Sequence, residues 1–295
     1  MVLPNFLVIG TARAGTSALT AFLQRHPQIF IPCKEPNYFS GWNSRKTFDG
    51  PRAKDIRPEL RCGTLEQYTS LFAESQGFKA RGEASVSYLP DADAPELIRE
   101  TIPDVALIAI LRQPAERAFA HFHLQRFHGQ EPASNLLEAL DQERRGMRRN
   151  WCPTFRYLEF GRYAEQLRRY QAVFPTDQLS VYLTDDWRKR PAWVWRQILD
   201  TLEVRPDFTP DFSERHAPTR TASPAWRLLQ RTRRIWPMVP RIARSRVAAF
   251  LRARLVSYPT LSRALRNEVT ERYFRDEILR LEEVLGSELP DWRPN

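Results

Sequence analysis

The segment with the clearest chemical potential is Gly10-Thr-Ala-Arg-Ala-Gly-Thr-Ser17. It follows an apolar run at residues 6–9 and precedes Leu19, Phe22 and Leu23, which share one face of a predicted helix. A strand, a glycine loop and a helix in this order direct backbone N–H groups and the positive end of the helix at one point, which suits a phosphate. The Gly-Lys-Ser/Thr of a Walker A motif is absent, so a phosphate that is held fits better than one transferred from ATP. Taken alone, the segment is equally compatible with a simple tight turn.

Two arginines extend this chemistry. Arg13 lies in the middle of the glycine loop, and Arg112 ends the most apolar run of the chain, residues 105–111. That run has the pattern of a buried parallel strand, and a helix is predicted from Ala115 to about Gln125. An arginine at the carboxyl end of such a strand is placed to meet an anion, and its planar guanidinium suits phosphate. The alternative for Arg112 is an ion pair with Glu116 and no other role.

A carboxylate that could act as a base lies in the loop Pro32-Cys-Lys-Glu-Pro36. The two prolines predict a shaped loop around Lys34 and Glu35. Glu35 could take a proton from a substrate hydroxyl or amine, which is worth roughly 10²–10⁴-fold in rate. A solvated charge pair is the alternative, and it is the commoner outcome for an arbitrary Lys-Glu sequence. His121 and His123 are alternative bases, but on an amphipathic helix a structural role is favoured for both.

Short apolar strands alternate with helices along the first two thirds of the chain. Strands are predicted at 6–9, 28–31, 105–111 and 178–183, and residues 79–88 are predicted to be a strand that breaks into a loop. Helices are predicted from 16, and at 64–72, 94–100, 115–125, 136–145, 157–170 and 187–202. This alternation predicts an α/β fold with a central parallel sheet and helices on both faces. Ligands of such folds bind beyond the carboxyl ends of the strands, where the loops that carry Arg13 and Arg112 begin.

The composition is that of a globular protein. Of the 295 residues, 42% are hydrophobic and 27% are charged, which fits one α/β domain with additions. Three scattered cysteines make neither a disulfide framework nor a zinc site, so a reducing compartment fits best. The first strand follows Met1 almost directly, and no apolar run reaches the roughly 18 residues of a membrane span. We therefore expect no signal peptide, no transmembrane helix and a cytoplasmic location.

The C-terminal third is strongly basic. Between Arg215 and Arg272 there are 14 arginines and two acids, within a formal net charge of +10 for the chain. Helical stretches are predicted there at 225–235, 242–256 and 261–285. A basic face that steers an anionic nucleotide or acceptor is the favoured interpretation. Peripheral contact of residues 231–254 with an anionic membrane stays open, whereas nucleic acid is disfavoured because no aromatic platform lies among the arginines.

Taken together, these segments resemble sulfotransferases that use 3′-phosphoadenosine 5′-phosphosulfate (PAPS), and among them the bacterial relatives of the glycan (heparan-type) branch. Residues 9–19 are similar to the 5′-phosphosulfate loop of that family, and residues 111–122 to its 3′-phosphate motif. Lys34-Glu-Pro-Asn-Tyr-Phe39, and Gly82-Glu-Ala-Ser85 with Tyr88, look like two further segments of the branch. Further matches follow in order to Trp292, so the resemblance covers nearly the whole chain.

The resemblance implies a fold and a reaction. The fold is a P-loop-like parallel sheet in a single domain over 1–295, with an α/β core at 1–205 and a basic closing loop and C-terminal helices at 206–295. The reaction is metal-independent transfer of a sulfuryl group from PAPS to a hydroxyl or amine of a glycan, lipid or small-molecule acceptor, giving adenosine 3′,5′-bisphosphate (PAP). Glu35 would be the base, Arg13 would stabilise charge on the bridging oxygen, and Lys34 completes the catalytic set.

The resemblance also implies two binding sets. The nucleotide would be bound by the loop N–H groups and hydroxyls, by Arg112 at the 3′-phosphate and by a late basic loop, that is by Arg13, Ala14, Gly15, Thr16, Ser17, Arg112, Ala120 and Arg220. The acceptor would be bound by Asn37, Glu83, Ser85 and Tyr88.

Two positions depart from the family pattern. Ala120 stands where the family has a serine, which removes one phosphate hydrogen bond worth roughly 1.5–3 kcal/mol if nothing replaces it. Asn37 stands where the glycan branch often has histidine, so the details of acceptor binding do not transfer. The alternative function is therefore a non-catalytic nucleotide- or anion-binding protein, and Glu35 argues against it, because a relative without activity need not keep that carboxylate.

Overall fold

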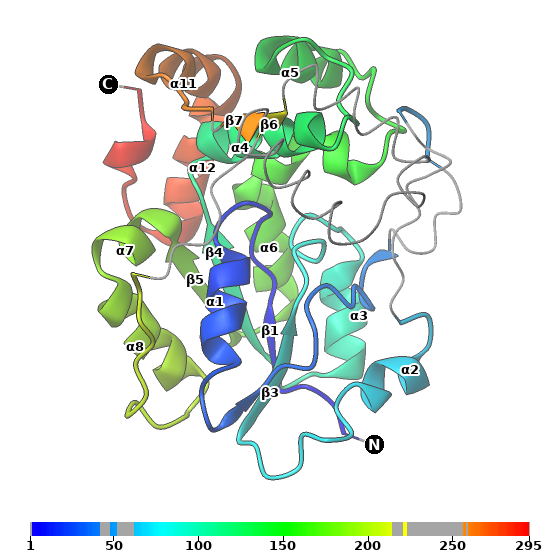
Figure 1. Ribbon diagram of the computed structural model, residues 1–295, viewed down its shortest axis with the longest axis vertical. Helices are drawn as coiled ribbons and strands as arrows, with labels where there is room; N and C mark the ends of the chain where they lie inside the picture. The colour runs from blue at the N-terminus through cyan, green and yellow to red at the C-terminus, as the bar shows by residue number, and fades with distance from the viewer. Residues whose placement is uncertain are drawn as a thin grey trace, which may run out of the picture.

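Five short strands form a parallel sheet at the centre of the protein (Figure 1). In the computed structural model they are β1 (Phe6–Val8), β2 (Ile29–Phe30), β3 (Ala80–Ala84), β4 (Ala106–Leu111) and β5 (Leu179–Leu183). Their order across the sheet is β2-β3-β1-β4-β5, and every neighbouring pair is parallel. The predicted α/β fold with a central parallel sheet is confirmed.

The structure describes residues 2–41, 48–51, 62–213, 221–222, 256–257 and 259–294. Arg220, the predicted closing-loop residue, lies outside the described residues. So do the predicted helical stretch at 225–235, the segment 231–254 with its alternative of membrane contact, and the stretch at 242–256 except for its last residue, Val256, which begins a strand.

Helices occupy most connections between the strands. They are α1 (Thr16–Leu23), α2 (Leu65–Ser70), α3 (Ala94–Thr101), α4 (Pro114–Phe127), α5 (Leu136–Arg144), α6 (Tyr163–Val173), α7 (Thr184–Lys189), α8 (Pro191–Thr201), α11 (Arg263–Val269) and α12 (Arg275–Leu285). Short 3-10 helices lie at Pro153–Phe155, Glu159–Gly161, Thr176–Gln178 and Pro290–Trp292, and a π-helical turn at Thr270–Phe274 joins α11 to α12.

Two helices differ from the prediction, and both differences have a local cause. The helix predicted at 157–170 begins only at Tyr163, because Arg162 has φ −83° and ψ 61°, outside the helical region. The helix predicted at 187–202 is two helices, α7 and α8. Pro191 disfavours the helical conformation for the residue before it, and Arg190 accordingly has φ −139°.

The sheet buries a different set of side chains on each face, since side chains alternate along a strand. Phe6 and Val8 of β1 belong to a cluster with residues of α1 and α8. Leu7 belongs to a cluster on the other face, with residues of α3, α6 and α12 (Figure 1). Helices therefore cover both faces, as predicted.

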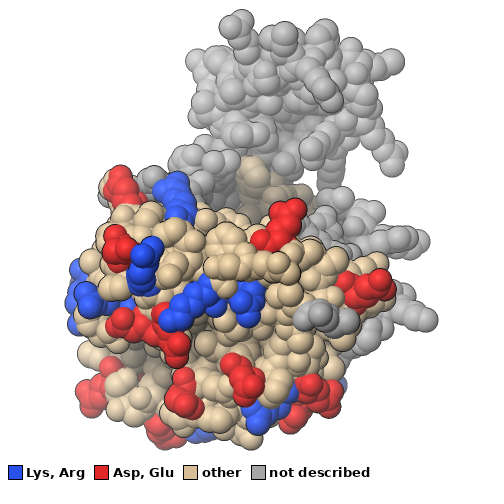
Figure 2. Space-filling model, turned by 90° about the horizontal axis from the view of Figure 1, so that it is seen from below, with Lys and Arg blue, Asp and Glu red and all other residues tan. Residues whose placement is uncertain are grey.

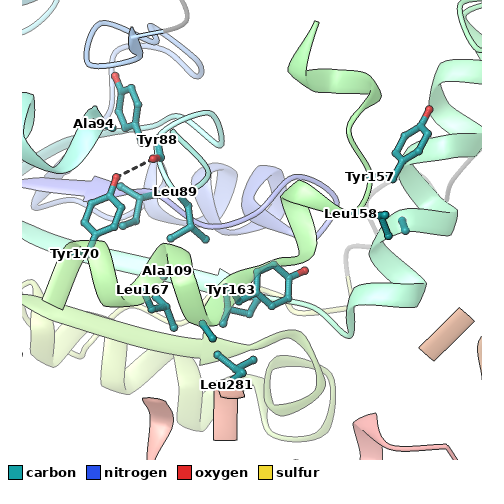
Figure 3. Packing of buried hydrophobic residues seen from close by; sticks show 14 of the residues in the cluster. Tyr88, Leu89, Ala94, Ala109, Tyr157, Leu158, Tyr163, Leu167, Tyr170 and Leu281 are labelled. Carbon is teal, nitrogen blue, oxygen red and sulfur yellow. Dashed lines mark hydrogen bonds between the residues drawn. The ribbon is translucent and has the colours of Figure 1, made fainter. Parts of the chain in front are cut away.

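The C-terminal helices share the core of the sheet domain. Figure 3 shows Leu281 of α12 beside Leu167 and Tyr163 of α6, and all three belong to one hydrophobic cluster. On the same helix α6, the Tyr170 hydroxyl donates to the Tyr88 carbonyl oxygen at 2.9 Å (Figure 3). A two-stranded antiparallel sheet of β6 (Thr221–Ala222) and β7 (Val256–Ser257) lies beside α4 (Figure 1).

Charged side chains of both signs are interspersed on the face shown in Figure 2, where lysines and arginines lie beside acids. Much of the excess positive charge is elsewhere in the sequence, since residues 223–255 contain nine arginines and no acid. In the part of the chain that the structure describes, none of the helices has both the length and the apolar character to cross a membrane.

Gly82 of β3 tests the close contact between β3 and β1. A Cβ atom at this position would lie 2.5 Å from both the ring and the carbonyl oxygen of Phe6. We expect Gly82→Ala to lower the free energy of unfolding by about 1–3 kcal/mol, the usual cost of overpacking, as measured by urea denaturation. Gly63→Ala is the matched control, because among the described residues its Cβ would meet only Gln67, at 3.6 Å, and its effect should stay within about 0.5 kcal/mol. Equal stability of the two variants would contradict this packing.

Candidate active site

The glycine loop after β1 is held against β4 by the backbone. Thr11 N–H donates to the Ile110 carbonyl oxygen at 3.0 Å. A Cβ atom on Gly10 would lie 2.5 Å from the Ile110 nitrogen, so glycine is required for this close approach. The start of the loop therefore has a fixed position relative to the end of β4.

The loop then turns sharply into α1. Arg13 (φ 71°) and Gly15 (φ 98°) both adopt the left-handed conformation. Gly15 is the N-cap of α1 and has no side chain to cap it, and the N–H groups of Ala18 and Leu19 donate to the Gly15 carbonyl oxygen. The N–H groups of Thr16 and Ser17, at the start of the helix, are therefore suited to an anion. Burial, together with the neighbouring charge of Arg112, lowers the pKa of Arg13 from its ordinary value. The guanidinium groups of Arg13 and Arg112 are thus close to one another beside the glycine loop.

Thr184, at the start of α7, joins the glycine loop to the end of β4. Its hydroxyl lies 2.9 Å from both the Ala14 and the Leu111 carbonyl oxygens. Arg112 Nη1 donates to the Arg13 carbonyl oxygen at 3.1 Å. These contacts bring the two predicted anion-binding segments together.

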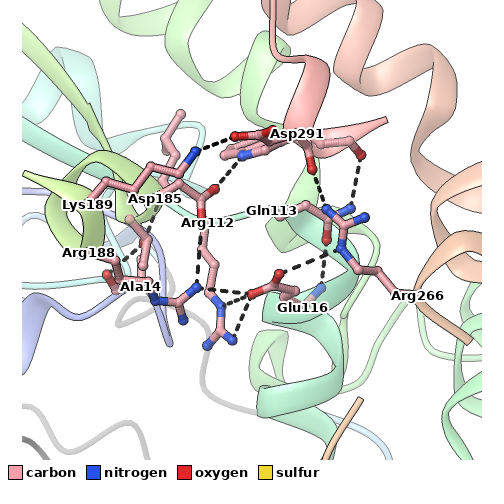
Figure 4. Close-up of polar contacts among 12 residues, drawn as sticks. Ala14, Arg112, Gln113, Glu116, Asp185, Arg188, Lys189, Arg266 and Asp291 are labelled. Atoms are coloured by element: carbon pink, nitrogen blue, oxygen red, sulfur yellow. Dashed lines mark hydrogen bonds and ion pairs between the residues drawn. The ribbon is translucent and has the colours of Figure 1, made fainter. Parts of the chain in front are cut away.

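Three arginines surround Glu116 on α4 (Figure 4). Arg112 donates from Nε and Nη2 to Glu116 Oε2 at 3.1 and 3.0 Å. Arg188 Nη1 lies 3.5 Å from the same oxygen, and Arg266 Nε lies 3.6 Å from Oε1. Burial raises the pKa of Glu116, but the three arginines outweigh it and lower the pKa overall. The alternative of an Arg112–Glu116 pair is therefore observed. Arg188 also lies 3.6 Å from Asp185 Oδ1, and three arginines against these two carboxylates still leave one excess positive charge, which suits a phosphate.

The C-terminal segment fixes the start of α4 beneath this cluster. Gln113 Oε1 accepts the Glu116 N–H at 2.8 Å, and Gln113 Nε2 donates to Thr270 Oγ1 at 2.8 Å and to the Trp292 carbonyl oxygen at 3.3 Å (Figure 4). Tyr163 OH donates to the carbonyl oxygen of Arg112 at 2.8 Å. The position of the arginine cluster thus depends on segments far apart in the sequence.

Lys34 and Glu35 lie at the carboxyl end of β2, next to the glycine loop. Glu35 N–H donates to the Ala84 carbonyl oxygen at 2.8 Å, which extends the pairing of β2 with β3. Lys34 Nζ donates to Ser17 Oγ at 2.8 Å and lies 3.2 Å from Glu35 Oε1. Glu35 Oε2 accepts the Val86 N–H at 3.1 Å. The pair is therefore held by contacts from α1 and β3, with 30% and 31% of the two side chains exposed, and is not simply solvated.

The backbone around Glu35 is strained and anchored. Glu35 (φ 58°) and Asn37 (φ 54°) are both left-handed, which is unusual for residues other than glycine. Asn37 Nδ2 donates to the Glu35 carbonyl oxygen at 3.0 Å, and Ser87 Oγ donates to Asn37 Oδ1 at 2.7 Å. Asn37 N–H donates to Ser85 Oγ at 3.1 Å. The loop after β3 therefore holds the Glu35 loop in its strained conformation.

Glu83, Ser85 and Tyr88 lie beneath the Glu35 loop and are fully buried. Ser85 Oγ donates to Glu83 Oε2 at 2.8 Å, and Tyr68 OH donates to Glu83 Oε1 at 3.4 Å. Contact of these three residues with an acceptor stays a prediction, and their burial favours a role in positioning the loop that carries Glu35.

A cavity of about 320 Å³ opens beside Glu35. Its wall includes Asn37 of the Glu35 loop, Ala12 of the glycine loop, and His121, Leu124 and Gln125 of α4. The cavity therefore lies between the predicted base and the predicted anion loop, where an acceptor could meet a bound donor.

The two histidines of α4 have structural surroundings. The ring nitrogens of His121 lie 3.2 Å from Arg117 Nη1 and 3.2 Å from Thr154 Oγ1. Burial, and then the nearby arginines, hold the pKa of His121 well below its usual range. Burial also lowers the pKa of His123 to about 4, and its ring packs against Phe119 with centroids 4.3 Å apart. These surroundings favour structural roles for both.

Sequence reasoning missed several residues of this site. Arg188 and Arg266 contact the predicted elements, although the sequence does not single them out. Thr184 lies in a segment, Thr184-Asp-Asp186, that resembles the family, but the sequence predicts no role in the site for it. Arg188 carries a usable signal, since it follows shortly after the end of a predicted strand. Arg266 carries none, because it reaches the site only when α11 packs back against α4. Ala120 is buried on α4, and its predicted place in nucleotide binding is untested.

Comparison with known proteins relates the chain to sulfotransferases. A sulfotransferase of known structure from Alicyclobacillus acidocaldarius is 29% identical and superimposes with a TM-score of 0.73 over 99% of both chains. The mouse bifunctional heparan sulfate N-deacetylase/N-sulfotransferase 4 is 28% identical over 98% of this chain and 31% of the mouse protein. The membrane-associated sulfotransferase kil1 of Dictyostelium discoideum is 36% identical over 42% of this chain and 23% of its own length.

The chain spans less than a third of the length of these two curated relatives. No protein-family profile matches it. The likeness to the solved structure, by contrast, extends over the full length of both chains.

Glu83 makes the stability of the protein depend on pH. Burial raises the pKa of Glu83 from about 4.5 to about 8, opposed by the hydroxyls of Tyr88, Ser85 and Tyr68 and reinforced by the charge of Glu35. The folded state therefore favours the neutral acid. The stability that Glu83 contributes is complete below pH 4.5 and is lost as the pH rises through about 8.

We expect the free energy of unfolding of the wild type, relative to that of Glu83→Gln, to fall by on the order of 3–5 kcal/mol between pH 4.5 and pH 8.5. Urea denaturation of both proteins at several pH values measures this, and other titrating groups cancel in the difference. Parallel pH curves for the two proteins would show that Glu83 does not titrate in this way.

Proposed function

Because the chain belongs to the sulfotransferases that use PAPS, we propose that it transfers a sulfuryl group from PAPS to a hydroxyl or amine of an acceptor held beside Glu35, with PAP as the second product. One observation carries the proposal. Lys34 Nζ contacts both Ser17, at the start of the helix after the glycine loop, and the carboxylate of Glu35. The anion loop and the base are therefore within reach of a single side chain.

The donor nucleotide would bind through two anionic groups. Backbone N–H groups of residues 14–17, with the hydroxyls of Thr16 and Ser17, would hold the 5′-phosphate at the start of α1. Arg112 would bind the 3′-phosphate, and Arg188 and Arg266 would add charge to the same place. These three arginines face the carboxylates of Glu116 and Asp185, and a phosphate would neutralise the remaining positive charge, which supports this assignment.

The reaction is an in-line displacement at sulfur. The acceptor oxygen or nitrogen forms a bond to sulfur, the bond from sulfur to the bridging phosphate oxygen breaks, and the acceptor proton passes to the Glu35 carboxylate. Arg13 stabilises the charge that develops on the leaving phosphate oxygen, a contribution of roughly 3–4 kcal/mol for one preorganised donor. Arginine, lysine and backbone N–H groups supply the positive charge, so we include no metal in the reaction.

The geometry around Glu35 favours a catalytic protein over a non-catalytic nucleotide-binding one. A left-handed backbone at a residue other than glycine costs on the order of 1–3 kcal/mol. A protein that only binds the nucleotide has no use for this strain, whereas a base must be held in one orientation. The cytoplasmic location and any contact with a membrane remain predictions.

Glu35→Gln tests the base. We expect kcat to fall at least 100-fold, since an amide cannot accept the proton, while binding of PAP measured by calorimetry stays within a few-fold. Glu100→Gln, an exposed substitution on α3, is the control and should retain full turnover. Near-normal turnover of Glu35→Gln would remove Glu35 as the base.

Arg112→Ala tests the 3′-phosphate site. We expect the variant to bind PAP at least 10-fold more weakly but to bind adenosine 5′-monophosphate nearly as well as the wild type, because only PAP has the 3′-phosphate. Calorimetric titration of both nucleotides measures the difference, and Arg196→Ala, at an exposed position on α8, is the control. Equal loss of affinity for both nucleotides would disprove the assignment of Arg112.

A further inference from the structure

We propose that the acceptor is an uncharged, largely apolar small molecule that presents a hydroxyl or amine to Glu35. This inference rests on the proposed sulfuryl transfer and concerns the cavity beside Glu35. The cavity volume of about 320 Å³ lies at the lower end of the roughly 300–1,000 Å³ of small-molecule sites. It fits a ring system or a short chain better than a segment of several sugars.

The charge of the cavity wall is the first argument. Among the described residues that line the cavity, Glu35 is the only carboxylate, and none is a lysine or an arginine. His121 is kept neutral by its burial, and Asn37 and Thr154 are neutral polar residues. An anionic acceptor would bring a second negative charge toward Glu35 with no counterion from the described wall, which is costly in an apolar site.

The cations near the cavity are directed to other partners. Arg117 contacts His121 from behind the wall and donates to the Tyr157 carbonyl oxygen. Lys34 contacts Ser17 and Glu35. In the proposed reaction the other arginines of the site bind the donor. An acidic group on the acceptor would therefore find no ion-pair partner in the described cavity wall.

The apolar wall is the second argument. Carbon-rich side chains from four segments face the cavity, namely Phe48, Val86, Leu124 and Phe160. Burial of an apolar skeleton against such side chains is favourable in proportion to the apolar area that it removes from water. A charged or heavily hydroxylated acceptor would lose its hydration there without regaining it.

Gln125 adds a neutral polar side chain to the cavity wall. Gln125 Nε2 donates to Thr154 Oγ1 at 2.7 Å, whereas Gln125 Oε1 is buried without a hydrogen-bond partner among the described residues. Gln125 itself is 5% exposed and belongs to the cavity wall. A neutral amide side chain in the wall adds no counterion for an anionic acceptor.

This acceptor class differs from the polymer in the name of the mouse relative. Heparan sulfate is a polyanion, and recognition of a polyanion requires lysines or arginines along the acceptor site. A direct comparison of acceptors therefore tests the inference.

The test measures binding to the full chain loaded with PAP, by calorimetry. The probes are 2-naphthol, its anionic analogue 6-hydroxy-2-naphthoate, and N-desulfated heparin as the polyanion. We expect 2-naphthol to bind at least 10-fold more tightly than 6-hydroxy-2-naphthoate, and N-desulfated heparin to leave the binding of 2-naphthol unchanged.

A cation placed in the wall gives the matched variant. In Leu124→Lys, the ratio of the affinity for 2-naphthol to the affinity for 6-hydroxy-2-naphthoate should fall at least 10-fold. Leu97→Lys, at an exposed position of α3, should leave the preference as in the wild type. If the buried lysine prevents folding, the comparison of 2-naphthol with 6-hydroxy-2-naphthoate on the wild type still tests the inference.

The outcomes separate this inference from the function on which it rests. Equal or tighter binding of either anionic probe, or no binding of 2-naphthol, overturns the inference. In that case, transfer of label from ³⁵S-PAPS to an anionic probe would show that the protein is a sulfotransferase although the inferred acceptor class is wrong. A failure of the chain to bind PAP at all overturns both.

Discussion

The parallel register of β1 between β3 and β4 is the constraint on which the site depends. Val8 pairs with Ala84 on one side and with Ile108 on the other. Because the strands are parallel, their carboxyl ends open at one edge of the sheet, and the loops that carry Arg13, Glu35 and Arg112 leave there. Two glycines permit the close approach, Gly82 against Phe6 and Gly10 against Ile110. A slip of one residue would exchange the two faces of β1 and separate these loops.

Two carboxyl groups close to this edge have opposite surroundings. Glu35 has a lysine and a backbone N–H as partners and is partly exposed, whereas Glu83 is fully buried among hydroxyl groups. Pairs of acids whose surroundings differ in this way divide the work of a site between them. Here the buried, neutral acid holds Ser85, and Ser85 Oγ accepts the N–H of Asn37 in the loop that presents the other acid.

The sequence predicts the features that depend on local pattern. The apolar run at 105–111 predicts a buried strand, and the glycines and Arg112 are predicted correctly to meet at strand ends. The sequence does not predict the features that depend on tertiary packing. Arg266 reaches Glu116 only through the packing of α11 on α4, and nothing in the spacing of Gly82-Glu-Ala-Ser85 tells whether Glu83 is buried or exposed. The break between α7 and α8 is an intermediate case. Pro191 signals a helix break in the sequence, but the apolar periodicity continues on both sides of it and predicts a single helix.

The distribution of charge around the site links the two halves of the proposed reaction. Arg112, Arg188 and Arg266 lie at the position proposed for the 3′-phosphate of the donor, while Glu35 faces the acceptor cavity. In that reaction Glu35 becomes neutral when it takes the acceptor proton, so it does not oppose the arrival of the negative sulfuryl group. Once Glu35 returns the proton to water, its negative charge lies beside a newly sulfated product in a site of low polarity. Repulsion between the two then favours release of the product, so a single carboxylate can serve both bond formation and product departure.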